Sequence, residues 1–372
     1  MKVPFIDITR FEPGFEARWS EKVQAMSHAA QFIGGPEVFT LEARLKGITG
    51  VEHVVGCANG TDAIQLALRA LGVGAGDVVV VPNATFWATF EAVVNVGATP
   101  VTVDISLADG GIDLDALKDA VVSERPKAVI AVHLYGWGSS EIAAIRAFCK
   151  EEGVALLEDG AQCFGTTFNN VPLLQDAQIS TTSFYPAKVL GAAGDAGAVF
   201  TNDPELADKV RRLGNHGRTA HYGYGDAGWN SRLDALQAAF LNLALDVLDA
   251  RIASRRTAAA RYRDLLPAVG LKPMAAPVGY AENGYCNVCL IEDAPYKAHL
   301  EARLKERGVG FGNIYPGAMS SQPGAAPYLK NHYGGDNAEK LSRQVLNLPL
   351  FAYLTDAEID YVVECVGSVG AE

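Results

Sequence analysis

No stretch of this sequence is a candidate for a membrane-spanning helix, which needs about 18 consecutive apolar residues. The N-terminal residues 1–7 lack the apolar core of a signal peptide. We therefore expect a cytoplasmic protein without a membrane partner. The 372 residues show no internal repeat and no low-complexity segment, and they suffice for one large domain and a smaller one.

Positive charge is also scarce. The formal net charge is −12, and the lysines and arginines form no basic cluster. Binding to nucleic acid depends on cations that neutralise phosphates, so this composition argues against a nucleic-acid partner and against a DNA-binding regulator. A substrate that carries a diphosphate must instead be met by locally placed hydrogen-bond donors.

Neither the six cysteines nor the seven histidines have the spacing of a complete metal site. Cys286 and Cys289 are spaced like half a zinc site or a redox pair, but no second pair lies nearby. They fall in the apolar residues 285–291, which predict a strand, and positions three apart on a strand face opposite sides. We interpret the pair as structural and expect no metal.

Short apolar runs and amphipathic stretches, in contrast, alternate along much of the chain. This alternation predicts an α/β fold, with a mostly parallel sheet flanked by helices. The predicted strands are 53–57, 77–82, 100–104, 127–133 and 154–158; the predicted helices are 15–30, one beginning near 60, 85–94, 115–121 and 140–152. A long helix is predicted from 230 to Pro267. Residues 1–267 then form a large domain and 268–372 a smaller C-terminal α/β domain.

One lysine has almost only small and apolar neighbours in the sequence. Lys188 lies among small and apolar residues between Ser183 and Gly191. Such surroundings remove solvent from the ammonium and lower its pKa, so that more of the amine is a free nucleophile. The alternative is an ordinary surface lysine on a loop.

A carboxylate at the end of a predicted strand weakens that alternative. The apolar residues 154–157 lead into Glu158 and Asp159, and ligands of α/β sheets bind at the carboxyl ends of strands. His133 ends another strand, as a pocket residue or as a core histidine. A lysine that can form an imine and a carboxylate that can hold a pyridinium nitrogen are the minimum that pyridoxal phosphate (PLP) requires.

A third feature is a helix N-terminus. A short strand ends before Asn59, and a helical pattern begins at Gly60 and Thr61. Free N–H groups and the helix dipole favour an anion there, such as the phosphate of PLP. The alternative use of Asn59 and Thr61 is simple helix capping.

Three blocks, residues 158–162, 183–188 and 228–239, resemble the signature blocks of the DegT/DnrJ/EryC1/StrS family. The resemblance extends from about residue 4 to residue 349. It implies aminotransferase fold type I and a PLP-dependent nucleotide-sugar aminotransferase. The donor would be an amino acid, glutamate by resemblance, and the acceptor a keto group of a nucleotide-linked deoxysugar, at C-3 rather than C-4. The product would serve O-antigen, glycan or antibiotic synthesis.

The resemblance also implies roles for single residues. Lys188 would bind PLP and move protons, Asp159 would hold the pyridine nitrogen, and Gln162 would lie against the cofactor. The remaining cofactor contacts would be Gly60, Thr61, Trp87 (stacked on the ring), Ser183 and Asn230. Asn230 would reach the phosphate in a neighbouring subunit, which implies a homodimer with shared sites. The implied substrate contacts are Phe32, Tyr185, Arg232, Asn313 and Tyr315.

The sequence departs from the family pattern at a few positions. Ala187 stands where the family often has Thr or Ser, and Asn313 and Ser321 stand where it commonly has histidine. The last two lie in a substrate-linked segment, so they leave the sugar open. Two alternatives remain: a PLP-dependent sugar dehydratase, in whose C-3 branch a histidine typically replaces the lysine, and a non-catalytic sensor or regulator.

Overall fold

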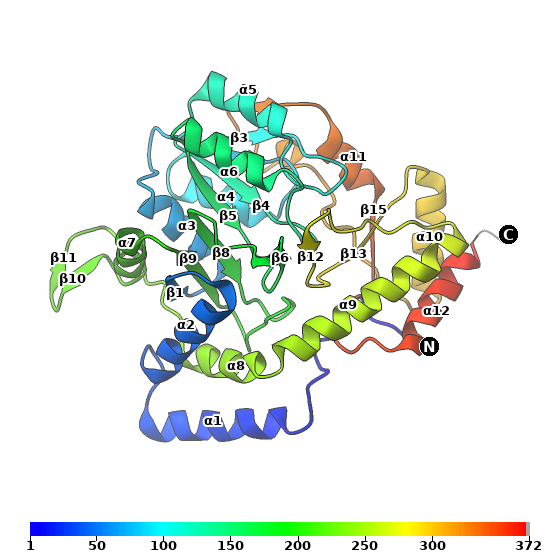
Figure 1. The fold of residues 1–372 in the computed structure, drawn as a ribbon, viewed down its shortest axis with the longest axis horizontal. Coiled ribbons are helices and arrows are strands. Elements are labelled where there is room, and N and C mark those ends of the chain that lie inside the picture. The colour runs from blue at the N-terminus through cyan, green and yellow to red at the C-terminus, as the bar shows by residue number, and fades with distance from the viewer. Residues whose placement is uncertain (370–372) are drawn as a thin grey trace.

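An eight-stranded sheet forms the centre of the computed structural model, which describes residues 1–369 (Figure 1). Its strands follow the order β1-β9-β8-β5-β4-β2-β3-β14. Their bounds are β1 His53–Cys57, β2 Val78–Pro82, β3 Thr99–Val103, β4 Ala128–Val132, β5 Ala155–Asp159, β8 Ile179–Ser183, β9 Gly197–Thr201 and β14 Asn331–Tyr333. Neighbouring strands are parallel except where β9 pairs with β1 and β8. The predicted α/β fold with a mostly parallel sheet is confirmed.

Helices cover both faces of this sheet because its strands are apolar on both sides. Val79 and Val81 of β2 belong to the same buried cluster as helices α3 (Gly60–Ala70), α4 (Trp87–Asn95) and α7 (Pro204–Gly214). Val80, which points the other way, packs with α5 (Leu114–Glu124) and α6 (Ile142–Glu151). A third cluster joins β1 and β9 to α2 (Pro36–Thr49) and α8 (Ala235–Leu245).

The long helix predicted from residue 230 to Pro267 is wrong in its bounds and its continuity. The structure has α8, then a break at Asp246 and Val247, then α9 (Leu248–Leu265) and the short 3-10 helix η1 (Leu266–Val269). Asp246 forms ion pairs with Arg18 and Arg44 at 3.3 and 3.0 Å. The two helices also pack in different places, because α8 lies against α1 (Phe15–Ala29) and α2 while α9 packs on the C-terminal part of the chain.

The C-terminal part has its own buried cluster around a two-stranded antiparallel sheet. Its elements are β13 (Asn287–Leu290), α10 (Ala294–Glu306), η2 (Met319–Ser321), α11 (Asn337–Gln344), β15 (Val345–Leu348) and α12 (Asp356–Gly367). The cluster also takes Ala258 and Tyr262 from α9 and Val3 from the N-terminus, while β14 joins the large sheet. The domain boundary at 267/268 stays a prediction.

Two small sheets complete the fold. Strands β6 (Thr167–Phe168), β7 (Val171–Pro172) and β12 (Tyr280–Ala281) form one, and β10 (Arg218–Ala220) and β11 (Gly223–Tyr224) form the other. The β10–β11 hairpin projects at the left of Figure 1 and exposes Tyr222 and Tyr224.

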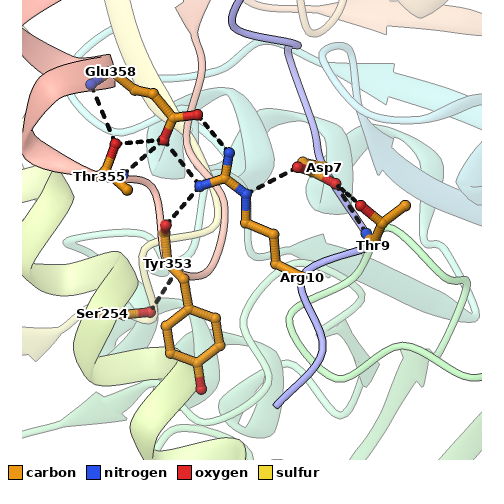
Figure 2. Close-up of polar contacts among 7 residues, drawn as sticks. All are labelled: Asp7, Thr9, Arg10, Ser254, Tyr353, Thr355 and Glu358. Atoms are coloured by element: carbon orange, nitrogen blue, oxygen red, sulfur yellow. Dashed lines mark hydrogen bonds and ion pairs between the residues drawn. The ribbon is translucent and has the colours of Figure 1, made fainter. Parts of the chain in front are cut away.

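Arg10 connects the N-terminal segment to the start of the C-terminal helix through hydrogen bonds and ion pairs (Figure 2). Its guanidinium donates to Asp7 Oδ2 at 2.9 Å, to the carbonyl of Tyr353 at 2.7 Å and to Glu358 Oε2 at 2.9 Å. Glu358 also closes the capping box that starts α12 with Thr355. The N-terminal segment is therefore held against the C-terminal helix.

Cys286 and Cys289 are both buried, and they belong to different apolar clusters. No group of three or more His, Cys, Asp or Glu side chains within residues 1–369 could hold a metal ion. No helix in the same range is long and apolar enough to cross a membrane.

Candidate active site

A cavity of about 430 Å³ opens where β5 and β8 end and α3 begins. Eight of the residues predicted from the sequence line it: Gly60, Thr61, Asp159, Gln162, Ser183, Tyr185, Lys188 and Tyr315. A larger groove of about 720 Å³ lies at the opposite, N-terminal ends of β4, β5 and β8, where residues of α6 also line it, and it contains none of the predicted residues. The smaller cavity is therefore the candidate site.

Lys188 lies in the loop between β8 and β9 and is half-buried. Its amine donates a hydrogen bond to the Tyr285 hydroxyl at 3.3 Å and lies 5.2 Å from the centre of that ring. Burial lowers the pKa of Lys188, and the charge of Asp159 only partly offsets this. The structure thus gives Lys188 the reactive surroundings that its sequence context indicates.

The alternation of β5 separates the acidic pair at its end. Asp159 lines the cavity, where its carboxylate accepts from the Ala161 N–H at 3.0 Å and from the Thr89 hydroxyl at 3.2 Å. Burial raises the pKa of Asp159, although these contacts and Lys188 act against the shift. A cation placed beside this carboxylate would relieve that cost.

Glu158 faces away from the cavity and pairs with Arg146 and His133. Arg146 Nε lies 2.7 Å from Glu158 Oε1, and His133 Nε2 lies 2.8 Å from Oε2. Burial raises the pKa of Glu158, but the hydrogen bonds from His133 and Arg146 outweigh it and bring the pKa below its ordinary value. His133 therefore lies in the core, which agrees with the alternative that it is a core histidine and not a pocket residue.

The N-terminus of α3 forms one wall of the cavity. Asn59 caps the helix by accepting the Asp62 N–H at 2.8 Å. This leaves the N–H groups of Gly60 and Thr61 without intrahelical acceptors, next to Ser183 on β8. A Cβ on Gly60 would come within 2.7 Å of the Ser183 Cβ, so only glycine permits this close approach of helix and strand. Capping by Asn59 therefore leaves the N–H groups of Gly60 and Thr61 available to a phosphate.

Gln162 and Tyr315 close the cavity from the side of the C-terminal residues. Gln162 Nε2 donates to the Tyr315 hydroxyl at 2.7 Å, and its Oε1 accepts the Tyr135 N–H at 2.7 Å. Gln162 is 4% exposed, so both contacts are shielded from water. The pair connects the loop after β5 to the segment before η2.

The structure does not bring Trp87 to the cavity; its neighbour Phe86 lines it instead. Trp87 is the first residue of α4 and stacks on Phe90, with ring centres 5.1 Å apart. Phe86 is the N-cap, in an extended conformation, and its ring lies 5.9 Å from that of Tyr315. Phe86, not Trp87, therefore lines the cavity; the aromatic contact with the cofactor ring stays a prediction.

Four more predicted residues lie outside the cavity of the single chain: Phe32, Asn230, Arg232 and Asn313. Asn230 is exposed, and the side chain of Arg232 donates to Asn215 Oδ1 at 3.4 Å. The Phe32 ring is 43% exposed. Asn313 Oδ1 is buried and has no hydrogen-bond partner in the described part of the chain. Their proposed roles stay predictions.

The lining residues that the sequence reasoning did not assign include Phe86, Asp195 and Tyr285. Phe86 adjoins the predicted aromatic, and Asp195 follows the glycine-rich run after Lys188. Tyr285 lies 97 positions from Lys188, so no local pattern could have linked the two.

These residues fit PLP on observations made in this chain. The free N–H groups at α3 and the Ser183 hydroxyl suit a phosphate. The buried Asp159 suits a protonated ring nitrogen, and the Lys188 amine has a lowered pKa. The cavity brings all of them together.

Comparison with known proteins agrees with this site. The DegT/DnrJ/EryC1/StrS aminotransferase family matches residues 15–367. The chain is 37% identical, over 97% of its length and 98% of the relative, to UDP-2-acetamido-2-deoxy-3-oxo-D-glucuronate aminotransferase of Pseudomonas aeruginosa. It is 39% identical to UDP-N-acetyl-3-dehydro-α-D-glucosamine 3-aminotransferase of Acidithiobacillus ferrooxidans, covering 89% of this chain and 88% of the relative.

A solved structure of NtdA from Bacillus subtilis with the bound cofactor PMP superposes with a TM-score of 0.91 at 28% identity. The match covers 100% of this chain and 86% of that protein. The fold, the cofactor and the reaction type therefore agree with the residues found in the cavity. The chain belongs to the DegT/DnrJ/EryC1/StrS aminotransferase family and is a PLP-dependent aminotransferase.

Proposed function

We propose that this enzyme moves an amino group from an amino acid, with glutamate as the expected donor, to C-3 of a nucleotide-linked ketosugar. The observation that carries the proposal is the Lys188 amine, which has a lowered pKa and shares a cavity with Asp159 and the α3 N-terminus. The names of the two relatives, which specify a 3-oxo and a 3-dehydro sugar, support a sugar acceptor and favour C-3. We also propose that the reaction takes place in the cytoplasm.

Cofactor binding would divide among the lining residues. Gly60, Thr61 and Ser183 would hold the phosphate, and Asp159 the ring nitrogen. We assign the ring-facing aromatic role to Phe86 in place of Trp87, because Phe86 lines the cavity. When bound, PLP supplies an electron sink that stabilises negative charge at the carbon next to the reacting nitrogen.

Lys188 would bind the cofactor and then carry protons. Its lowered pKa increases the fraction of free amine, which can accept a proton from the donor α-carbon. The same amine, once protonated, can return the proton to an adjacent carbon. Half-burial in the cavity keeps bulk water from exchanging that proton freely.

Substrate selection would depend on residues at the open side of the cavity. Tyr185 and Tyr315 line it directly, and Tyr185 is 55% exposed. Phe32, Arg232 and Asn313 lie outside it in the single chain, so we propose that they act only in the dimer or at the nucleotide end of the substrate. Asn313 and Ser321 still leave the identity of the sugar open.

The shared site remains part of the proposal. Asn230 is exposed in the single chain and makes a bridge to Asn215 through the backbone. Its exposure is compatible with a contact to the cofactor phosphate of a second subunit. We propose a homodimer in which each subunit supplies Asn230 to its partner.

Dehydration is the second candidate reaction within the family, and Lys188 argues against it. The two can be separated with isotopically labelled glutamate and a panel of nucleotide ketosugars. We expect the labelled nitrogen to appear in the sugar, bonded to C-3 in the NMR spectrum of the product. Label at C-4 would correct the position, and an unlabelled sugar that has lost water would replace the proposal with dehydration.

A further inference from the structure

Tyr285 contacts Lys188 and has no role in the mechanism so far. It lines the active cavity, and its hydroxyl accepts a hydrogen bond from the Lys188 amine at 3.3 Å. The amine also lies 5.2 Å from the centre of the Tyr285 ring, within the range of a cation–π contact. One side chain thus makes two contacts to the reacting nitrogen.

Hydrogen bonds to the loops after β4 and β5 fix the position of Tyr285. Its backbone N–H donates to Asn283 Oδ1 at 2.9 Å. The Asn283 amide in turn donates to the carbonyls of Gln162 and Phe164 at 2.9 and 3.0 Å, and its backbone N–H donates to Gly136 at 3.2 Å. Because β5 also carries Asp159, these hydrogen bonds fix the position of the Tyr285 phenol relative to both Lys188 and Asp159.

The chemistry of these contacts favours a protonated lysine. Burial raises the pKa of Tyr285, so its phenol stays neutral and adds no charge of its own. A neutral phenol oxygen accepts from an ammonium, and the face of the ring attracts a cation. Burial acts in the opposite direction and lowers the pKa of Lys188.

Other groups also bear on the amine. Asp159 on β5 and Cys286, next to Tyr285, both act to raise the pKa of Lys188, but burial has the larger effect and the net shift is downward. The remaining titratable groups that line the cavity are Tyr185, Asp195 and Tyr315. Among all these groups, Tyr285 makes the hydrogen bond to the amine.

We propose that Tyr285 is the positioning residue of Lys188: it holds the amine at the cavity whenever the amine is not bonded to the cofactor, and it keeps part of the amine protonated. The inference rests on the proposed role of Lys188 as proton carrier. A lysine held in this way can return a proton as well as take one.

The test is the pH dependence of Lys188 acylation in the full chain without cofactor, followed by mass spectrometry of the Lys188 peptide. In Tyr285→Phe the ring stays and the hydroxyl is lost. We expect the acylation midpoint to fall by about 0.5–1 pH unit, since one hydrogen bond to the charged form disappears. Tyr280→Phe is the matched control, because this half-buried phenol donates to the Ser139 carbonyl instead of contacting Lys188; the midpoint in this variant should not move.

A second readout uses the enzyme loaded with PLP. The rate of its reaction with glutamate should show the same downward shift of the acid limb of the pH profile in Tyr285→Phe. An unchanged acylation midpoint would overturn the inference and leave the proposed function intact. Failure of glutamate to react with either form would instead remove the proposed donor, whatever the midpoint.

Discussion

At the scale of the residue, Asp159 and Glu158 show how neighbouring carboxylates of the same strand are used differently. Burial raises the pKa of Asp159 in the cavity, so its charge is costly to the folded protein. In Asp159→Asn we expect a rate of amino transfer about 10²–10³-fold lower, by analogy with the loss of one preorganised electrostatic contact. The cofactor-free protein should be as stable as wild type or more so, in thermal unfolding monitored by circular dichroism.

Glu158→Gln is the matched control on the other face of β5. Glu158 forms an ion pair with Arg146 and a hydrogen bond with His133, so removing its charge leaves the largely buried Arg146 guanidinium without its counter-charge. We expect this variant to lose about 3 kcal/mol of unfolding free energy. A fully active Asp159→Asn enzyme would contradict the role given to Asp159.

Sequence reasoning could find Lys188, Asp159 and the residues at the α3 N-terminus because each lies in a local pattern. It placed the ring aromatic at Trp87 because the family aromatic belongs to this turn; the side chain that reaches the cavity depends on where α4 begins, and the N-cap is Phe86. Tyr285 could not be found, because its contact with Lys188 depends on how residues 283–285 dock on the loops after β4 and β5.

At the scale of the element, the start of α3 is packed directly on β8. In Gly60→Ala the new methyl would meet the Ser183 Cβ at 2.7 Å and push the helix from the strand. We expect about 1–3 kcal/mol of lost unfolding free energy from this overpacking. If these N–H groups hold the phosphate, the dissociation constant of PLP, measured by fluorescence, should rise together with it because the N–H groups move.

Gly47→Ala provides the control for this change. Gly47 lies in α2, and a Cβ there would meet no atom within 4 Å. It should leave PLP binding unchanged and stabilise the helix by up to about 1 kcal/mol. Unaltered PLP binding in Gly60→Ala would show that the α3 N-terminus does not hold the phosphate.

The strands of the sheet could be predicted because apolar runs bounded by turns are typical of buried parallel strands. The division between α8 and α9 could not, since no glycine or proline marks it: residues 246 and 247 are Asp and Val. The break coincides with a change of packing partners between the two helices, and Asp246 at the break pairs with Arg18 and Arg44. Such tertiary contacts override a continuous helical pattern.

At the scale of the whole molecule, the Arg10 network joins the chain ends. The hydrogen bond from Arg10 lowers the pKa of Glu358 from 4.5 to about 2. Since the folded-state pKa is depressed, the stabilisation is complete above about pH 4.5 and is lost as pH falls towards 2. Glu358→Gln should therefore be less stable than wild type at pH 7, by about 1 kcal/mol.

The difference between Glu358→Gln and wild type should shrink as the pH of the denaturation experiment falls below 4.5. Asp360→Asn is the control: Asp360 pairs with Arg261 at an exposed position of the same helix, so its loss should change stability little. A Glu358→Gln difference that stays constant down to low pH would show that the ion pair does not stabilise the fold.

A shared active site predicts complementation between inactive subunits. Lys188→Ala lacks the amine, and Asn230→Asp would place a negative charge against the partner's phosphate. After the two variants exchange subunits, a mixed dimer has one intact site, and random pairing gives about a quarter of wild-type activity. Activity that stays at the level of the separate variants would argue against sites completed by Asn230.

The most direct test of the central claim, that Lys188 carries amino transfer, is the visible absorption spectrum of the protein with PLP, recorded for wild type and Lys188→Ala. We predict that wild type shows the band of the lysine-bound cofactor, that glutamate removes it, and that a nucleotide-linked 3-ketosugar restores it. Lys188→Ala should lack the band and the turnover. Full turnover by Lys188→Ala, or a wild-type band that ignores glutamate while the sugar is consumed, would contradict the account.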